Sequence, residues 1–164
     1  MSGKLGRKIL VAIDEGDESA YALSWSLKNL LTDNCNYENT LILLYAKQPS
    51  AVAYMPMDSA GYMSSSSIIS TMERYSNQVA QTVLERAKRI CDELNPQVKV
   101  ETMVEYGDPR DVICEAADKL KVDFLIMGSR GYGVIKRALL GSVSTHCAHN
   151  VNCPVMIVKK PIKP

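Results

Sequence analysis

Apolar and polar positions follow two alternating patterns along the chain. Short runs of branched apolar residues at 8–13, 40–46, 122–127 and 154–160 predict buried strands. The run "VKVETMVEYG" places Val98, Val100, Thr102 and Val104 on one face, which predicts one more strand. The continuous apolar character of 40–46 is typical of a parallel sheet covered on both faces.

Apolar residues recur at helical spacing between these runs. The first predicted helix, within 18–31, has an apolar face made of Ala20, Leu23, Leu27, Leu30 and Leu31. The face of the second consists of Met72, Tyr75, Val79, Val83, Ala87, Ile90 and Leu94. The third opens with Asp108 as N-cap and Pro109 at its first position, and its face consists of Val112, Ile113, Ala116, Ala117 and Leu120. A short fourth helix is expected from about Ser142.

Strands and helices therefore alternate, which predicts an α/β fold with a mostly parallel sheet between two helical layers. Residues 47–69 interrupt the alternation with a long loop rich in Ser, Met, Tyr and Pro. Such a loop is either functional or disordered, and its tyrosines and methionines are expected to form a lid or partner surface, or to pack locally. We expect one domain over 1–164, ending in an exposed tail at 160–164.

Composition narrows the class of protein. The net charge is +1 over 164 residues, so no basic excess points to nucleic acid as a partner. No apolar stretch is long enough to span a bilayer or resembles a signal peptide. The five cysteines are scattered without a Cys-x-x-Cys pair, as expected for reduced thiols of a cytoplasmic protein.

A zinc site is an alternative interpretation of His146, Cys147, His149 and Cys153, which lie close together in the sequence. Structural zinc needs ligands that converge, commonly from two separated pairs. Three of these residues fall on one short predicted helix, so we expect core packing and surface histidines, with no metal.

A glycine-rich segment carries the strongest functional pattern. Gly128, Gly131 and Gly133 follow the strand at 122–127, and Gly141 precedes a predicted helix start. Free N–H groups and a positive dipole make a helix start suitable for phosphate. The P-loop pattern is absent, and Lys136 stands where a dinucleotide fingerprint has its last glycine.

The remaining spacing is Gly-x2-Gly-x9-Gly-Ser, and it resembles the nucleotide-binding signature of the universal stress protein family. Three further blocks resemble the same family: "ILVAIDEGDESAYAL", "YGDPRDVICEAA" and "NCPVMIVK". The resemblance covers nearly the whole chain except the 47–69 loop. It implies a Rossmann-like open sheet of five parallel strands in the order 3-2-1-4-5, and a homodimer joined through the C-terminal strand, 154–159.

The resemblance also implies that ATP or AMP binds, with any Mg2+ held through the phosphates. The residues expected beside adenine and ribose are Ala12, Ile13, Asp14 and Ala46. Those expected beneath the sugar and α-phosphate are Met127 and Gly128. Those expected around the phosphates are Arg130, Gly131, Gly141, Ser142, Val143 and Ser144.

The general topology of open α/β sheets favours the same location for a ligand. Ligands of open α/β sheets lie beyond the carboxyl ends of the strands, where the strand order reverses. In the family's order this point lies between Asp14 and Gly128. The alternative role for Asp14 is helix capping.

The function implied is that of a cytoplasmic adenine-nucleotide-binding regulator or sensor of the stress response. No catalytic base or paired metal-binding carboxylates can be placed near the phosphates. Two alternatives stay open: a slow ATP-hydrolysing or phosphotransfer enzyme that uses the same pocket, and a nucleotide-independent interaction scaffold.

Overall fold

A single parallel sheet organises the molecule. The computed structural model describes residues 6–32, 38–49, 66–129 and 140–161. Its strands are β1 (Lys8–Ile13), β2 (Thr40–Lys47), β3 (Lys99–Tyr106), β4 (Phe124–Gly128) and β5 (Val155–Val158). They pair in parallel in the order β3-β2-β1-β4-β5, which confirms the predicted α/β fold and strand order.

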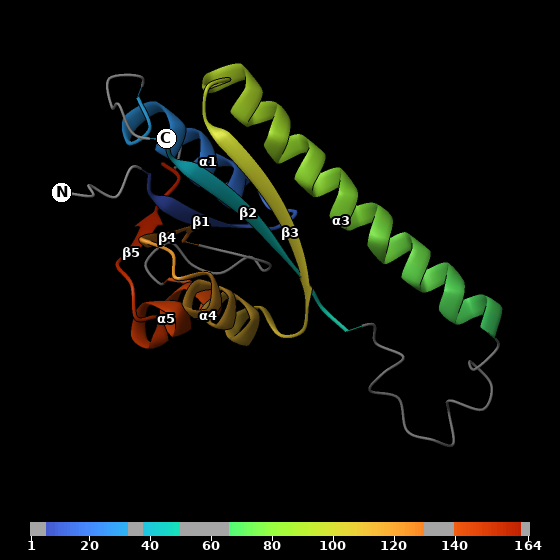
Figure 1. Ribbon diagram of the computed structural model, residues 1–164. Coiled ribbons are helices and arrows are strands. Elements are labelled where there is room, and N and C mark those ends of the chain that lie inside the picture. The colour runs from blue at the N-terminus through green and yellow to red at the C-terminus, as the bar shows by residue number, and fades with distance from the viewer. Residues whose placement is uncertain (1–5, 33–37, 50–65, 130–139, 162–164) are drawn as a thin grey trace.

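Helices cover both faces of this sheet (Figure 1). The helices α1 (Asp17–Asn29) and α3 (Ser66–Leu94) pack on one face. The helices α4 (Pro109–Leu120) and α5 (Ser142–Asn150) pack on the other. No helix in the described ranges combines the length and apolar composition needed to cross a membrane.

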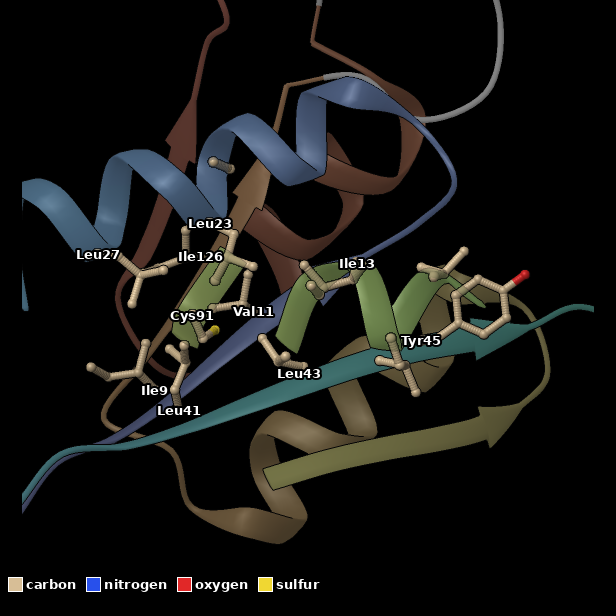
Figure 2. Packing of buried hydrophobic residues seen from close by; sticks show 14 of the residues in the cluster. Ile9, Val11, Ile13, Leu23, Leu27, Leu41, Leu43, Tyr45, Cys91 and Ile126 are labelled. Carbon is tan, nitrogen blue, oxygen red and sulfur yellow. The ribbon is translucent and has the colours of Figure 1, made fainter. Parts of the chain in front are cut away.

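The central strands are buried on both faces because alternate side chains enter two separate cores. Figure 2 shows the core beneath α1 and α3, where Ile9 and Val11 of β1 meet Leu23 of α1. The intervening Leu10 belongs to the second core, beneath α4 and α5. This double burial explains why β1 and β2 read as continuous apolar runs.

The predicted face of α1 was partly wrong. Ala20 is only half-buried, whereas Ala22 is fully buried. Two serines, Ser19 and Ser26, also lie in the core. Ser26 tolerates burial because its hydroxyl donates a hydrogen bond of 2.7 Å to the carbonyl oxygen of Ala22.

The bounds and face of α3 also differ from the prediction. The helix begins at Ser66, so the predicted loop at 47–69 ends earlier, and residues 50–65 lie outside the described residues. Tyr75 is 69% exposed and Leu94 is 38% exposed. The first turns of α3 extend beyond the strands (Figure 1). The buried face is made of Ala80, Val83, Leu84, Ala87 and Cys91.

The predicted strand at β3 has alternating apolar residues, but the face that they form is not covered along the whole strand. Val100 is half-buried, but Thr102 and Val104 are exposed. The strand β3 lies at the edge of the sheet, and the helical layers leave most of its side chains uncovered.

The predicted start of α4 is confirmed. Asp108 is its N-cap, and a side-chain oxygen of Asp108 accepts a hydrogen bond of 2.9 Å from the backbone N–H of Arg110. The Arg110 side chain and this N–H lower the pKa of Asp108 to about 2. The predicted apolar face is buried through Val112, Ile113, Ala116 and Ala117, with Leu120 packed at its margin.

Candidate functional site

A pocket of about 550 Å³ lies at the carboxyl ends of β1, β2 and β4. It forms where the chain leaves β1 toward one helical layer and leaves β4 toward the other. The predicted site residues that line it are Ala12, Ile13, Asp14, Ala46, Met127, Gly128, Gly141, Ser142, Val143 and Ser144. Arg130 and Gly131 lie outside the described residues.

Several lining residues escaped prediction from the sequence. The walls also include Glu15, Tyr45 and Gln48, and the first half of α3 contributes Tyr75 and Val79. Glu15 and Tyr45 are sequence neighbours of the predicted residues Asp14 and Ala46, so their place in the sequence could have suggested them. The contribution of α3 to the pocket depends on how this helix packs across the sheet. No local sequence pattern predicts that packing.

Asp14 has a local structural role through one of its oxygens. Its Oδ1 accepts hydrogen bonds of 2.9 Å from the backbone N–H of Gly16 and from the hydroxyl of Ser19. These bonds close the turn into α1, whose N-cap, Gly16, provides no capping side chain. Asp14 therefore does not cap α1 as the alternative had it, since the N-cap is Gly16, but its Oδ1 holds the turn that precedes the helix. Its Oδ2 accepts no hydrogen bond from the described residues.

The partly buried Glu15 and the buried Tyr45 form a hydrogen-bonded pair in the wall. The Tyr45 hydroxyl donates a hydrogen bond of 2.6 Å to Glu15 Oε1. Burial and then the Glu15 carboxylate raise the pKa of Tyr45, which keeps its hydroxyl protonated. Glu15 Oε2 is buried and has no hydrogen-bond partner within the described parts of the chain. A buried carboxylate oxygen of this kind can accept a hydrogen bond from a ligand.

The start of α5 forms one end of the pocket and has features suited to an anion. The N-cap, Gly141, donates a hydrogen bond of 2.7 Å to the carbonyl oxygen of Ser129. The buried Ser144 hydroxyl donates one of 3.0 Å to the Gly141 carbonyl. These bonds fix the first turn, whose backbone N–H groups have no acceptor within the helix. The helix dipole adds a partial positive charge there.

Gly128 stands where two backbones come close together. A Cβ atom at this position would lie 2.9 Å from the carbonyl carbon and oxygen of Glu18 and 3.1 Å from the nitrogen of Ser19. The end of β4 therefore approaches the first turn of α1 so closely that only glycine fits. This steric requirement for glycine at position 128 does not depend on a bound ligand.

The four residues considered for zinc occupy ordinary packing positions. Cys147 is fully buried in the core beneath α4 and α5, and His149 is exposed. Within the described ranges, no three His, Cys, Asp or Glu side chains come together in a way that could hold a metal ion.

Comparisons with known proteins identify the family. The model of the universal stress protein family matches residues 6–159. Universal stress protein A-like protein of Arabidopsis thaliana is 27% identical, over 93% of this chain and 90% of its own length. Universal stress protein MJ0531 of Methanocaldococcus jannaschii is 30% identical, over 97% of this chain and 85% of its own length.

Solved structures share the fold. The structure of protein MJ0577 superposes with a TM-score of 0.73 at 24% identity, covering 97% of this chain and 99% of that one. An Arabidopsis thaliana universal stress protein family protein with AMP bound gives 0.68 at 24% identity, covering 94% and 92%. A universal stress protein in complex with cAMP gives 0.58 at 24% identity, covering 93% and 96%. The match over residues 6–159, together with this fold, shows that the chain belongs to the universal stress protein family.

Proposed function

We propose that this protein binds an adenine nucleotide, ATP or AMP, in the pocket at the ends of β1, β2 and β4, and acts as a cytoplasmic regulator or sensor of the stress response. The observation that carries this proposal is the convergence of the predicted nucleotide-contacting residues on one pocket. The AMP bound to the Arabidopsis relative and the cAMP bound to another member of the family support the ligand class.

The proposed ligand lies across the switch point of the sheet. Its phosphates approach the free N–H groups of Ser142, Val143 and Ser144 at the start of α5. Its ribose donates a hydroxyl hydrogen bond to Asp14 Oδ2, which the turn into α1 leaves available. Its adenine lies between the ends of β1 and β2, beside Ala12 and Ala46.

Mg2+ would be held through the phosphates and water. The carboxylates among the described lining residues are those of Asp14 and Glu15, both at the β1 end of the pocket. The α5 end, where the phosphates would lie, has no described carboxylate. Hard cations bound in this way coordinate phosphate oxygens and water and use few protein ligands.

Mass spectrometry of small molecules released from the denatured purified protein tests the proposal directly. We expect ATP, ADP or AMP, and we expect added ATP or AMP to raise the melting temperature of nucleotide-free protein. A protein that carries no nucleotide, and whose melting temperature does not respond to any, would favour the scaffold alternative. Multiple-turnover phosphate release would favour the enzyme alternative.

Asp14 offers a test that separates ligand contact from its role in closing the turn into α1. Asp14→Asn keeps an oxygen for Gly16 and Ser19 but replaces the other oxygen with an amide that cannot accept a ribose hydroxyl. We expect Asp14→Asn to weaken ATP and AMP about equally, by roughly fivefold to tenfold, because both contain the same ribose. Isothermal titration calorimetry would measure both affinities.

The matched control is Asp14→Ala, which loses both functions. It should also lower the free energy of unfolding, by about 1 kcal/mol, since the turn into α1 loses its acceptor. Wild-type affinity for both nucleotides in folded Asp14→Asn protein would remove Asp14 from the binding site.

We also propose a homodimer joined through β5. This strand pairs with β4 on one side only, and Val155, Met156 and Ile157 are half-buried in the single chain. An apolar edge with unpaired backbone groups favours pairing with a second copy. Two copies related by a two-fold axis would pair antiparallel.

The register of β5 identifies the variant that tests this interface. The Leu125 N–H donates to the Pro154 carbonyl, so the N–H groups of Met156 and Val158 face β4. The N–H of Ile157 therefore faces the open edge. We expect Ile157→Pro to give a folded monomer, whereas Met156→Pro should disturb the sheet itself.

Light scattering with circular dichroism would measure mass and folding together. A wild-type monomer at micromolar concentration, or an unchanged dimer in the Ile157→Pro variant, would contradict the interface.

A further inference from the structure

Two thiols on different helices come together beneath the pocket. Cys114 of α4 and Cys147 of α5 have their sulfur atoms 3.9 Å apart, and neither is in a disulfide. The two residues are far apart in sequence, so the packing of α4 against α5 brings them together. The described Cys91 lies in the other core, across the sheet.

The two thiols differ in access to solvent. Cys147 is fully buried, whereas Cys114 is half-buried at the margin of the same core. A small oxidant can therefore reach Cys114 first, and Cys147 is in position to react with the product. This is the arrangement of an attacking thiol and a resolving thiol.

We propose that Cys114 and Cys147 form an oxidation site, at which a peroxide converts the two thiols into an intramolecular disulfide that ties α5 to α4. In the first step the Cys114 sulfur attacks one oxygen of hydrogen peroxide. The O–O bond breaks, Cys114 becomes a sulfenic acid, and the leaving hydroxide takes the thiol proton to give water.

In the second step the Cys147 sulfur attacks the Cys114 sulfur. The S–O bond breaks, and the departing hydroxide takes the Cys147 proton to give a second water. Each thiol sulfur is oxidised by one electron, and the peroxide accepts both electrons as it is reduced to water. The sulfur atoms must approach from 3.9 Å to about 2.05 Å, which requires side-chain rotation and a shift of α5 toward α4.

Oxidation at this site is expected to be slow. Burial raises the pKa of Cys114, an effect that hydrogen bonding with the Cys147 thiol partly offsets. Burial also raises the pKa of Cys147 to about 12. Because the thiolate is the reactive form, the pair would respond to sustained oxidant and would stay reduced during brief exposure.

The disulfide would act close to the proposed ligand. Ile113, the neighbour of Cys114, lines the pocket, and Ser144 lies one turn before Cys147 in α5. A shift of α5 toward α4 would displace Gly141 and the first turn of α5 from the Ser129 carbonyl, which accepts hydrogen bonds from Gly141 and Ser144. We expect the oxidised form to bind ATP about fivefold more weakly or worse, a consequence that rests on the proposed function.

The test compares wild type, Cys114→Ser and the matched control Cys153→Ser. Each protein is treated with hydrogen peroxide at mildly alkaline pH, its free thiols are alkylated, and cross-linked peptides are mapped by mass spectrometry. We expect the Cys114–Cys147 linkage, with loss of two hydrogens, in wild type and Cys153→Ser but not in Cys114→Ser. The linked wild type should also melt several degrees higher without ligand, because the cross-link constrains the unfolded chain.

Linkage to Cys153, linkage only between molecules, or sulfinic acid at Cys114 without a disulfide would overturn the proposal. If the disulfide forms but the oxidised and reduced proteins bind ATP equally well, the proposed effect of the disulfide on nucleotide binding is overturned. If the disulfide forms and raises the melting temperature but neither form binds any nucleotide, the oxidation site is supported and the proposed function fails.

Discussion

Replacing Gly128 with alanine is expected to lower the free energy of unfolding by about 1–3 kcal/mol, the range for overpacking a well-packed core. The added Cβ would lie 2.9 Å from the carbonyl carbon and oxygen of Glu18. These are backbone atoms of α1, so no side chain can rotate away to relieve the contact. The first turn of α1 would have to move off β4, which loosens a buried helix-to-strand contact.

Urea denaturation of the variant and wild type measures this effect. Gly141→Ala is the matched control, since Gly141 has φ −62° and ψ 159°, which alanine also adopts. Its stability should stay within about 1 kcal/mol of wild type. A Gly128→Ala protein as stable as wild type would mean that α1 and β4 are less closely packed than the structure has them.

The sequence was informative where a strand is buried on both faces or where a cap marks the start of a helix. β1 and α4 were predicted to the residue or nearly so, since one is buried on both faces and the other starts at an Asp-Pro cap. The order of the strands came from the family resemblance, because alternation of strands and helices does not specify which strands are neighbours. The sheet confirms that order.

Prediction failed where exposure depends on distant parts of the chain. Tyr75 fits the apolar spacing of α3, yet it is exposed and lines the open pocket at the strand ends. Val104 fits a covered strand face, yet it lies on an edge strand. In both cases the local pattern was correct, but whether a neighbour covers that face is set by the tertiary arrangement.

The same distinction applies to the pocket. Asp14, Ala46 and Gly128 were predicted together from the family resemblance, and the topology of open α/β sheets favoured the same edge for Asp14 and Gly128. All three line one pocket. Their contacts with a nucleotide stay a prediction. The hydrogen bond between Tyr45 and Glu15 joins two strand ends through side chains and has no pattern in the sequence. The close approach of Gly128 to Glu18 also required coordinates, and it gives that glycine a structural role beside any ligand contact.

Gly141 consequently tests phosphate binding more cleanly than Gly128. Valine can adopt the Gly141 backbone angles, φ −62° and ψ 159°, so Gly141→Val should fold. The Gly141 N–H keeps its bond to Ser129, because the substitution leaves the backbone donor in place. What changes is the first turn of α5, where two methyl groups would stand beside the N–H groups that the phosphates must approach. Gly131, the other glycine of the signature, lies outside the described residues.

We expect Gly141→Val to weaken ATP and AMP binding by about tenfold or more, equivalent to ~1.4 kcal/mol or more of binding free energy. Adenosine is the informative control ligand, because it shares adenine and ribose but has no phosphate. Its affinity should change little, so the loss should appear only with phosphate-bearing ligands. Titration calorimetry with all three ligands, alongside circular dichroism, separates this result from a general disturbance of the pocket. Equal losses for adenosine and ATP would locate the damage away from the phosphates, and unchanged ATP affinity in the folded variant would contradict phosphate binding at the start of α5.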